Sequence, residues 1–454
     1  AENGFPVYPY LHQSLSLNLT KYTEHYPTTG EVYCPNGKAP EVGEILRNPD
    51  YAKVMRTMCK AEDTARHKGR VAGIEAASKA FYDGPIAESI VKFISDNPVE
   101  DASGSTHAGL LSYEDFADWN AAVEQPTSIN YRGLDVYKCP PWTQGPVLLQ
   151  QLSILEGFNL QKMGHNSSEY LHTLIETAKL AFADRETYYG DPLFDNVPLD
   201  ILFSTAYADK RRELISARAS SEMRPGDVGN GLPTFDLVNV VEDNRRALGV
   251  SASTIVDLGQ GHAHIGDTTH LDSADSEGNL VAATPSGGWL GTSPVIKGLG
   301  FPIGTRGQMF YLNPDRPNAL APRKRPRATL TPSLVTKNGA PFMAFGTPGG
   351  DSQDQWTLQA FLNVADFGMG IQEALDAPSV HSEAFPSSFY PHTSFQNRVK
   401  VEEGIDPSIV ADLERRGHEV IIDPAWSHGK VLCVRRDADT GLLEAGASPK
   451  NNIA

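Results

Sequence analysis

The segment GDTTHLDSADSEGNLVAATPSGGW, residues 266–289, decides how the second half of the chain is interpreted. THLDSAD and NLVAATP read as two strands around the turn Ser276-Glu277-Gly278-Asn279, which predicts a β-hairpin. Directly before the first strand stand an Asp, two threonines and a histidine. A capped surface hairpin would explain this arrangement, and so would a nucleophile placed at the start of a strand.

The chemistry of threonine indicates what the second interpretation requires. A threonine hydroxyl is a weak nucleophile without a base beside it, and the α-amine of an N-terminal threonine can be that base, with a reference pKa of about 7.7–8.0. Attack of Thr268 Oγ on the Asp267 carbonyl would release such an amine. Residues 216–267 are rich in Gly, Ser, Pro and charge, so we expect a mobile connection there, ending at the cut.

Two glycine-bearing turns could complete a site around Thr268. Gly346-Thr347-Pro348-Gly349-Gly350 follows the apolar run PFMAF and precedes a helical pattern, so its backbone N–H groups could face a developing oxyanion. Ser286-Gly287-Gly288 follows the second hairpin strand. Ordinary tight turns are the alternative for both.

The rest of the chain alternates between blocks of helix and blocks of strand. We expect helices between residues 40 and 97, over GPVLLQQLSILEGF, over SSEYLHTLIETAKLAFADRETYYGDP, at 353–367 and at 407–416, a strand in YRGLDVYKCPP, and a hairpin around Lys337-Asn338-Gly339. The third helix has an apolar stripe (Leu171, Leu174, Ile175, Ala178, Phe182) and an N-cap at Ser167 or Ser168. Asp184 and Arg185 within it suggest a structural ion pair. This block pattern predicts a layered arrangement of helices and strands rather than a barrel of βαβ units.

Composition limits the classes of partner. The 454 residues contain 39 Lys plus Arg against 56 Asp plus Glu, a net charge of −17 that argues against nucleic acid and anionic membranes and favours small molecules. No apolar run approaches the roughly 18 residues that a membrane helix needs. The cysteines form no CxxC pair and predict structural thiols: Cys34, Cys59, Cys139 and Cys433. The compartment is undetermined.

Two metal-site hypotheses are weaker than their alternatives. Asp272, Asp275 and Glu277 surround Gly278, but an EF-hand loop would begin at Ser273, so a solvated hairpin turn is the better interpretation. His262, His264 and His270 are ligand types, yet two of them lie in the expected connection. We expect no metal and no cofactor.

Several motifs, in this order, resemble the γ-glutamyltransferase family of N-terminal nucleophile hydrolases nearly end to end: GFPV, FYDG at 81–84, YRGLDVY, AFADRETYYGDP, TTH…D…GN…VA, RKRPRATLTPSL and GTPGGD. The resemblance implies an α+β fold, a four-layer αββα sandwich, made as a precursor that cuts itself before Thr268. Residues 1–267 and 268–454 would then be the large and small chains of one folded unit and would remain associated.

The resemblance also implies roles for single residues. Thr268 would be the nucleophile and, through its amine, the general base, with Thr269 and His270 matching the family pattern beside it. Ser286 falls where the family has a hydroxyl that hydrogen-bonds the nucleophile, and Gly349 and Gly350 match its oxyanion-hole glycines.

The sequence departs from the family where the substrate binds. Gly288 occupies the position of an Asn, the Gln/acid segment reads Gly304-Thr305-Arg306-Gly307-Gln308-Met309, and Ala328-Thr329 replaces a serine pair. An Arg cannot hold an ammonium, but it can clamp a carboxylate with two hydrogen bonds. We therefore expect a small amide substrate that has a carboxylate and needs no free α-amine. TPSGGW with GTRGQMF resembles the branch with oxamate amidohydrolase and acylase-like members.

A second departure lies at the front of the chain. The sequence begins where the family is already well into its large chain, so the family's first segment, with its substrate-carboxylate arginine, is expected to be missing. Three functions stay open: a self-processed amidohydrolase or acyltransferase, a conventional γ-glutamyltransferase acting on glutathione-like peptides, and an inactive, uncleaved member serving as a binding or structural protein.

Overall fold

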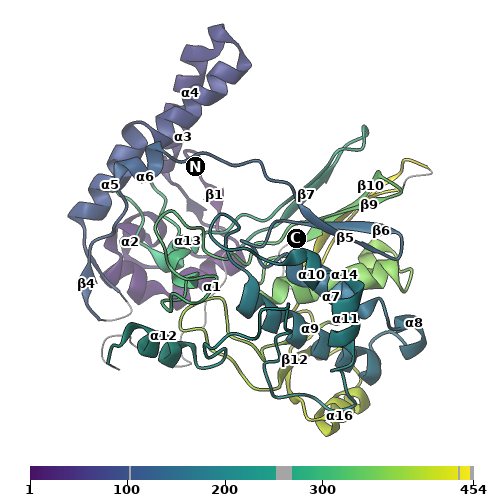
Figure 1. The fold of residues 1–454 in the computed structure, drawn as a ribbon. Coiled ribbons are helices and arrows are strands. Elements are labelled where there is room, and N and C mark those ends of the chain that lie inside the picture. Colours follow the sequence, from purple (N-terminus) through teal and green to yellow (C-terminus); the bar gives the residue numbers. More distant parts are fainter. Residues whose placement is uncertain (102–103, 252–267, 438–439, 450–454) are drawn as a thin grey trace. The chain divides into compact units, whose positions relative to one another are not determined.

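The computed structural model describes residues 1–101, 104–251, 268–437 and 440–449. It divides into two compact units, unit 1 (residues 1–123 and 287–305) and unit 2 (residues 124–286 and 306–454) (Figure 1). The predicted division between 267 and 268 concerns a cut in the chain rather than a boundary between compact units. It stays a prediction, because Asp267 lies outside the described residues.

Unit 1 is mainly helical, and it confirms the helices expected between residues 40 and 97. Helices α3 and α4 pack against each other and project as a hairpin from α5 and α6 (Figure 1). The elements are β1 Phe5–Pro6, α1 Pro9–Leu17, α2 Pro27–Tyr33, β2 Ile45–Leu46, α3 Pro49–Ala65, α4 Arg70–Tyr82, α5 Pro85–Asp96, β3 Val99–Glu100, β4 Thr106–His107, α6 Tyr113–Ala117 and α13 Trp289–Thr292.

Unit 2 contains a six-stranded sheet with the order β15-β14-β10-β9-β6-β5. Its strands are β5 Thr127–Tyr131, β6 Leu134–Lys138, β7 Leu271–Ala274, β8 Leu280–Ala283, β9 Ser333–Lys337, β10 Ala340–Gly346, β11 Val380–Ser382, β12 Arg398–Glu402, β13 Glu419–Asp423, β14 Leu432–Arg436 and β15 Leu443–Ala447. Its helices are α7 Pro146–Leu155, α8 Leu160–Met163, α9 Ser168–Tyr188, α10 Leu199–Leu202, α11 Thr205–Arg212, α12 Val240–Leu248, α14 Gln353–Ala365, α15 Ile371–Asp376 and α16 Pro407–Arg416.

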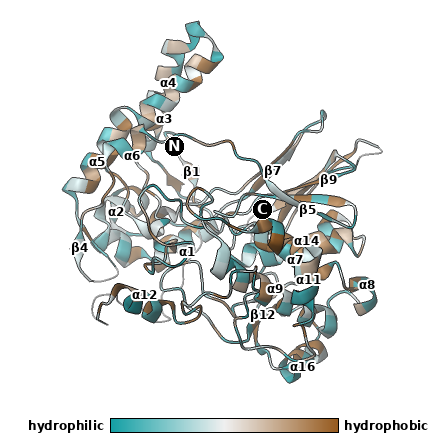
Figure 2. Cartoon of the chain, in the orientation of Figure 1, coloured by the Kyte–Doolittle hydropathy of each residue, from teal (hydrophilic) through white to brown (hydrophobic). Residues whose placement is uncertain are grey.

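The layers of unit 2 confirm the α+β class. Helices α7 and α14 pack against the six-stranded sheet, and the β7–β8 hairpin packs against β9, β10 and β14 as a second sheet. These are three successive layers of the expected sandwich. Figure 2 shows hydrophobic residues on the strands around β5 and β9 and on α7 and α14, where the core residues Val136, Leu148, Phe345 and Phe361 lie.

Both predicted hairpins of unit 2 are present. Strands β7 and β8 pair in antiparallel register, Leu271 opposite Ala283, and β9 and β10 are joined by Asn338 and Gly339 in left-handed conformations (φ 53° and 77°). In the β7–β8 turn, the Asp275 carboxylate accepts the backbone N–H groups of Glu277 and Asn279, both at 2.9 Å. The carboxylate therefore caps its own turn, and the predicted hairpin is confirmed.

Helix α9 differs from the predicted amphipathic helix. Ser167 is its N-cap, accepting the Tyr170 N–H at 3.1 Å, as expected. Residues 170–187, however, are all buried, including Glu176, Lys179 and Arg185. The helix is therefore enclosed on every side, and its charged residues are neutralised by internal ion pairs rather than by water.

The connection expected to be mobile over residues 216–267 is ordered in its described part. Arg224 forms an ion pair with Glu176 of α9 at 3.1 Å. Helix α12 is anchored by the buried pair of Asp243 and Arg316, at 2.9 Å. Residues 216–251 thus belong to the packed unit, and residues 252–267 lie outside the described residues.

Two further predictions concern the cysteines and membrane-spanning helices. All four cysteines are free thiols, as expected. In the described part of the chain, no helix combines the length and the apolar character that crossing a bilayer requires.

Candidate active site

The threonine and serine hydroxyls singled out in the sequence meet in unit 2. Thr268 precedes β7 and Ser286 follows β8, and the Thr269 N–H donates to the Pro285 carbonyl at 3.1 Å, which extends the hairpin pairing beyond its strands. This pairing brings Thr268 Oγ1 within hydrogen-bond distance of Ser286 Oγ, 3.0 Å. The two interpretations of this segment are therefore compatible, because the β-hairpin itself brings the two hydroxyls together.

A guanidinium group lies at the same pair of hydroxyls. Arg306 Nη2 donates a hydrogen bond to Ser286 Oγ. The guanidinium carbon of Arg306 lies 5.7 Å from the ring centroid of Phe389. Arg306 therefore brings a fixed positive charge next to Thr268.

The glycine turn also borders the Phe389 ring. Gly349 and Gly350 follow β10 with φ values of +136° and +56°, and the turn leads into α14. A Cβ on Gly349 would lie 2.4 Å from the Trp356 ring, and one on Gly350 would lie 3.2 Å from the Phe389 ring. Both the backbone conformation and the close neighbours require glycine here. Through Phe389, the turn and Arg306 border one site.

His270 is buried between the hairpin and β10. Its Nδ1 is 2.8 Å from Thr284 Oγ1, and its Nε2 is 2.9 Å from Asp272 Oδ1. Burial raises the pKa of Asp272, and the hydrogen bond from His270 opposes that shift. Gly346 leaves room for the ring, because a Cβ there would lie 2.3 Å from His270 Cε1. Both ring nitrogens are engaged, so His270 offers no lone pair to a metal; His262 and His264 lie outside the described residues.

The remaining predicted substrate residues are placed as follows. Thr329 is 1% exposed, and among the described residues its Oγ1 has no hydrogen-bond partner. Its neighbour Ala328 accepts the Gln144 N–H at 2.8 Å, and the Gln144 side chain donates to the Gly350 carbonyl at 3.1 Å. Thr329 therefore lies close to the glycine turn. Gly288 belongs to unit 1, where it precedes α13 with φ +89°; its role at the substrate stays a prediction.

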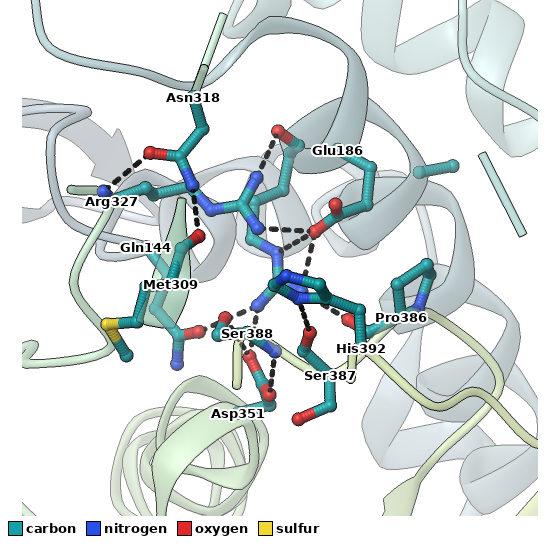
Figure 3. A network of polar contacts seen from close by, with 12 residues as sticks. Gln144, Glu186, Met309, Asn318, Arg327, Asp351, Pro386, Ser387, Ser388 and His392 are labelled. Carbon is teal, nitrogen blue, oxygen red and sulfur yellow. Dashed lines mark hydrogen bonds and ion pairs between the residues drawn. The ribbon is translucent and has the colours of Figure 1, made fainter. Parts of the chain in front are cut away.

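The polar network behind the glycine turn was missed by sequence reasoning (Figure 3). Asp184 and Arg185 do form ion pairs, but with other partners: Asp184 with Arg211 at 3.4 Å, and Arg185 with Glu186 and Asp351. Burial alone would raise the pKa of Glu186, but three arginines and a tyrosine hydroxyl lower it to about 2. One sequence signal could have indicated this network: charged residues stand among apolar ones in α9, a pattern that fits a helix buried on every side.

One cluster in the described residues has the side chains of a metal site. Ligand atoms of His172, Glu176 and His418 lie within 4.8 Å of one another. His172 Nδ1 is only 2.8 Å from His418 Nε2, whereas two nitrogens on one zinc ion, at about 2.0–2.1 Å each, are about 3.3 Å apart. Glu176 is already paired with Lys179 at 2.8 Å. The arrangement suits a hydrogen-bonded pair of neutral histidines better than a cation.

Comparison with known proteins gives a consistent result. The family model described as Gamma-glutamyltranspeptidase matches residues 1–453. The glutathione hydrolase proenzyme of Escherichia coli is 27% identical, over 99% of this chain and 68% of that protein. The solved structure of LmbA2991HD is 43% identical over 100% of this chain and 75% of that one, with a TM-score of 0.89. Cephalosporin acylase from Bacillus halodurans is 28% identical over 99% and 70%, with a TM-score of 0.76.

Proposed function

Because this chain belongs to the gamma-glutamyltranspeptidase family, whose members are hydrolases and transferases, we propose that it is a self-processing amide hydrolase or acyltransferase with Thr268 as its nucleophile. One observation carries the proposal: Thr268, Ser286 and Arg306 form a hydrogen-bonded chain, and the Phe389 ring contacts both Arg306 and the Gly350 position of the glycine turn. A nucleophile, a cation and a candidate oxyanion turn therefore border one site.

The reaction follows from these positions. Thr268 Oγ attacks the amide carbonyl carbon while the α-amine of Thr268 accepts the hydroxyl proton. The N–H groups of Gly349 and Gly350 stabilise the oxyanion. The C–N bond then breaks, and the amine leaves with that proton. Water adds to the acyl-enzyme ester by the same route in reverse, releasing the acid and restoring Thr268; an amine acceptor in place of water gives transfer.

The α-amine becomes available only if the Asp267–Thr268 bond is cut. The relative from E. coli is named a proenzyme, which supports such a cut here. The core supports lasting association of the two products. Leu148 and Leu171, before the cut, pack in one hydrophobic cluster with Phe345 and Phe361, after it. Separating the chains would expose this core, so we expect them to remain together.

The substrate class follows from Arg306. Its guanidinium lies at Ser286, next to the nucleophile, and is suited to a carboxylate on the acyl group. The sequence segment around it, 304–309, contains no acid that could hold an α-ammonium. We therefore propose an amide whose acyl part has a carboxylate and lacks an α-amine. Cephalosporin acylase, a structural relative, supports a site that accepts amides outside the γ-glutamyl class.

Two chromogenic amides test this substrate class. Glutaryl-p-nitroanilide keeps one carboxylate, and γ-glutamyl-p-nitroanilide adds an α-ammonium. We expect kcat/KM to be at least about tenfold higher for the glutaryl compound, and Arg306→Ala to raise its KM by about 10–100-fold, as loss of a charge-assisted bidentate pair would. The control is Arg415→Ala, which removes a charge that is 74% exposed on α16.

The results separate the alternatives. Faster release from the γ-glutamyl compound would favour a conventional γ-glutamyl enzyme acting on glutathione-like peptides, the substrate that the E. coli relative's name gives. An unchanged KM in Arg306→Ala would contradict the carboxylate clamp. A chain that stays intact and hydrolyses neither compound would identify an inactive family member.

A further inference from the structure

Arg185 is fully buried, and its guanidinium binds Gln144 and Asp351, the residues that contact and follow the glycine turn. Figure 3 shows the side chains of Gln144, Glu186 and Asp351 in this network. Arg185 Nη1 donates to Gln144 Oε1 at 2.8 Å and forms an ion pair with Asp351. Its Nη2 donates to the Pro386 carbonyl at 3.0 Å, and its Nε donates to Glu186 Oε1 at 2.9 Å. One side chain thus connects α9 to three other segments of unit 2, at Gln144, Asp351 and Pro386.

Gln144 and Asp351 connect Arg185 to the Gly349–Gly350 turn. Gln144 Nε2 donates to the Gly350 carbonyl at 3.1 Å. Asp351 is the next residue of the chain, so its side chain fixes the end of the turn. The two glycines have no side chains of their own to fix their conformation, and glycine is the residue with the most backbone freedom to lose. The turn therefore depends on neighbours for its orientation.

Asp351 also connects the turn to the other wall of the site. Its carboxylate accepts the Ser388 N–H at 2.8 Å and the Ser388 hydroxyl at 2.6 Å. Ser388 precedes Phe389, whose ring borders Gly350 and lies under Arg306. Displacing Asp351 would therefore disturb the glycine turn and the Phe389 wall together.

The buried charges of this network balance. Asp351, Arg185, Glu186 and Arg327 alternate in sign, with Arg327 Nη2 donating to Glu186 Oε1 at 2.7 Å. A buried charge is costly unless it is paired and hydrogen-bonded, and each of these has a partner. These four residues, here called the ionic anchor, can therefore be rigid in a position where a single unpaired charge would destabilise the fold.

We propose that Arg185 and Asp351 are positioning residues that orient the backbone N–H groups of the Gly349–Gly350 turn. This inference rests on the proposed function, because the orientation of the turn affects turnover only if the turn binds the oxyanion. Loss of one oxyanion-hole donor costs about 10²–10³-fold in kcat in a serine protease, and misplacing a donor forfeits part of that. The ionic anchor therefore acts on kcat more than on KM.

Asp351→Asn is the first test, because it keeps the shape and removes the charge. The matched control is Asp366→Asn at the opposite end of α14, where Asp366 accepts the Tyr131 hydroxyl at 2.8 Å and pairs with Arg132. We expect Asp351→Asn to lower kcat for the nitroanilide about 10–100-fold with KM changed less than about threefold. The control should change kcat by less than about threefold. Ser388→Ala, a milder change, should lower kcat by an intermediate factor.

Hydrogen exchange of the peptide that covers residues 346–352 provides a readout independent of activity. We expect exchange there to become at least about tenfold faster in Asp351→Asn and to stay unchanged in Asp366→Asn. Unchanged exchange in Asp351→Asn would overturn the positioning role, as would equal kcat losses in both variants. If the unmodified chain hydrolyses neither nitroanilide, the proposed function fails, and the exchange rates still decide whether Asp351 orders the turn.

Discussion

Replacement of Gly346 by Ala tests the packing of His270 between the hairpin and β10. The added Cβ would lie 2.3 Å from His270 Cε1 and 2.7 Å from each ring nitrogen. Contact at a normal carbon separation requires the ring or the strand to move by about 1 Å. Overpacking of this kind costs about 1–3 kcal/mol. A rotated ring would weaken the bonds to Thr284 and Asp272, each worth about 1 kcal/mol or more.

The free energy of unfolding of Gly346→Ala should therefore fall by about 2–4 kcal/mol, measured by urea denaturation followed by tryptophan fluorescence. Turnover should fall as well, since His270 lies two residues after Thr268. The control is Gly370→Ala: Gly370 has a φ of −61° and no atom within 4 Å of an added Cβ, so it should lose less than about 1 kcal/mol. A loss below about 0.5 kcal/mol in Gly346→Ala would refute the packing described for His270.

Three further perturbations have defined outcomes. Burial lowers the pKa of His172 and lowers that of His418 to about 3, so both side chains are neutral in the folded protein. The free energy of unfolding should therefore be highest above about pH 6.5 and fall as the pH drops toward about 3. Thermal melts across this range should show a shallower decline in His418→Gln, and an equal decline would contradict this role. Ser286→Ala should lower kcat about 10–100-fold while Ser286→Thr, which keeps the hydroxyl, stays within about threefold; equal rates in the two variants would exclude the hydroxyl. Lys138 and Asp354 form a fully buried ion pair at 3.0 Å, and burial raises the pKa of Asp354 to about 6 despite Lys138. Lys138→Met should lower the free energy of unfolding in urea by about 3–5 kcal/mol, and adding Asp354→Leu should recover part of that loss. Additive losses in the double variant would argue against the pairing.

The sequence-based predictions succeed where local chemistry decides the structure. The β7–β8 hairpin follows from its turn residues. The Thr268–Ser286 contact, which only the family resemblance implied, is held by the pairing of the two hairpin strands. The Gly349–Gly350 turn was predicted because the glycine pair falls between an apolar strand and a helical pattern. In each case, the residues that determine the conformation are neighbours in the chain.

The predictions fail where the partners are distant in sequence. Asp184 and Arg185 of α9 were predicted to form a structural ion pair, but Arg185 binds Asp351, Gln144 and Pro386, which lie far from it in the chain. Residues 216–251 are polar and glycine-rich, which is typical of a mobile connection. They are nevertheless ordered, because Arg224 and Asp243 find buried partners in α9 and at Arg316. Composition cannot reveal such long-range pairs.

The central claim is that Thr268 becomes a chain terminus and then acts as the nucleophile. The most direct measurement is mass spectrometry and N-terminal sequencing of the purified protein, beside a Thr268→Ala variant. We predict a fragment spanning residues 268–454 that begins Thr268-Thr269-His270, and an uncleaved Thr268→Ala chain. An intact chain after prolonged incubation, or the same cleavage in Thr268→Ala, would contradict the claim.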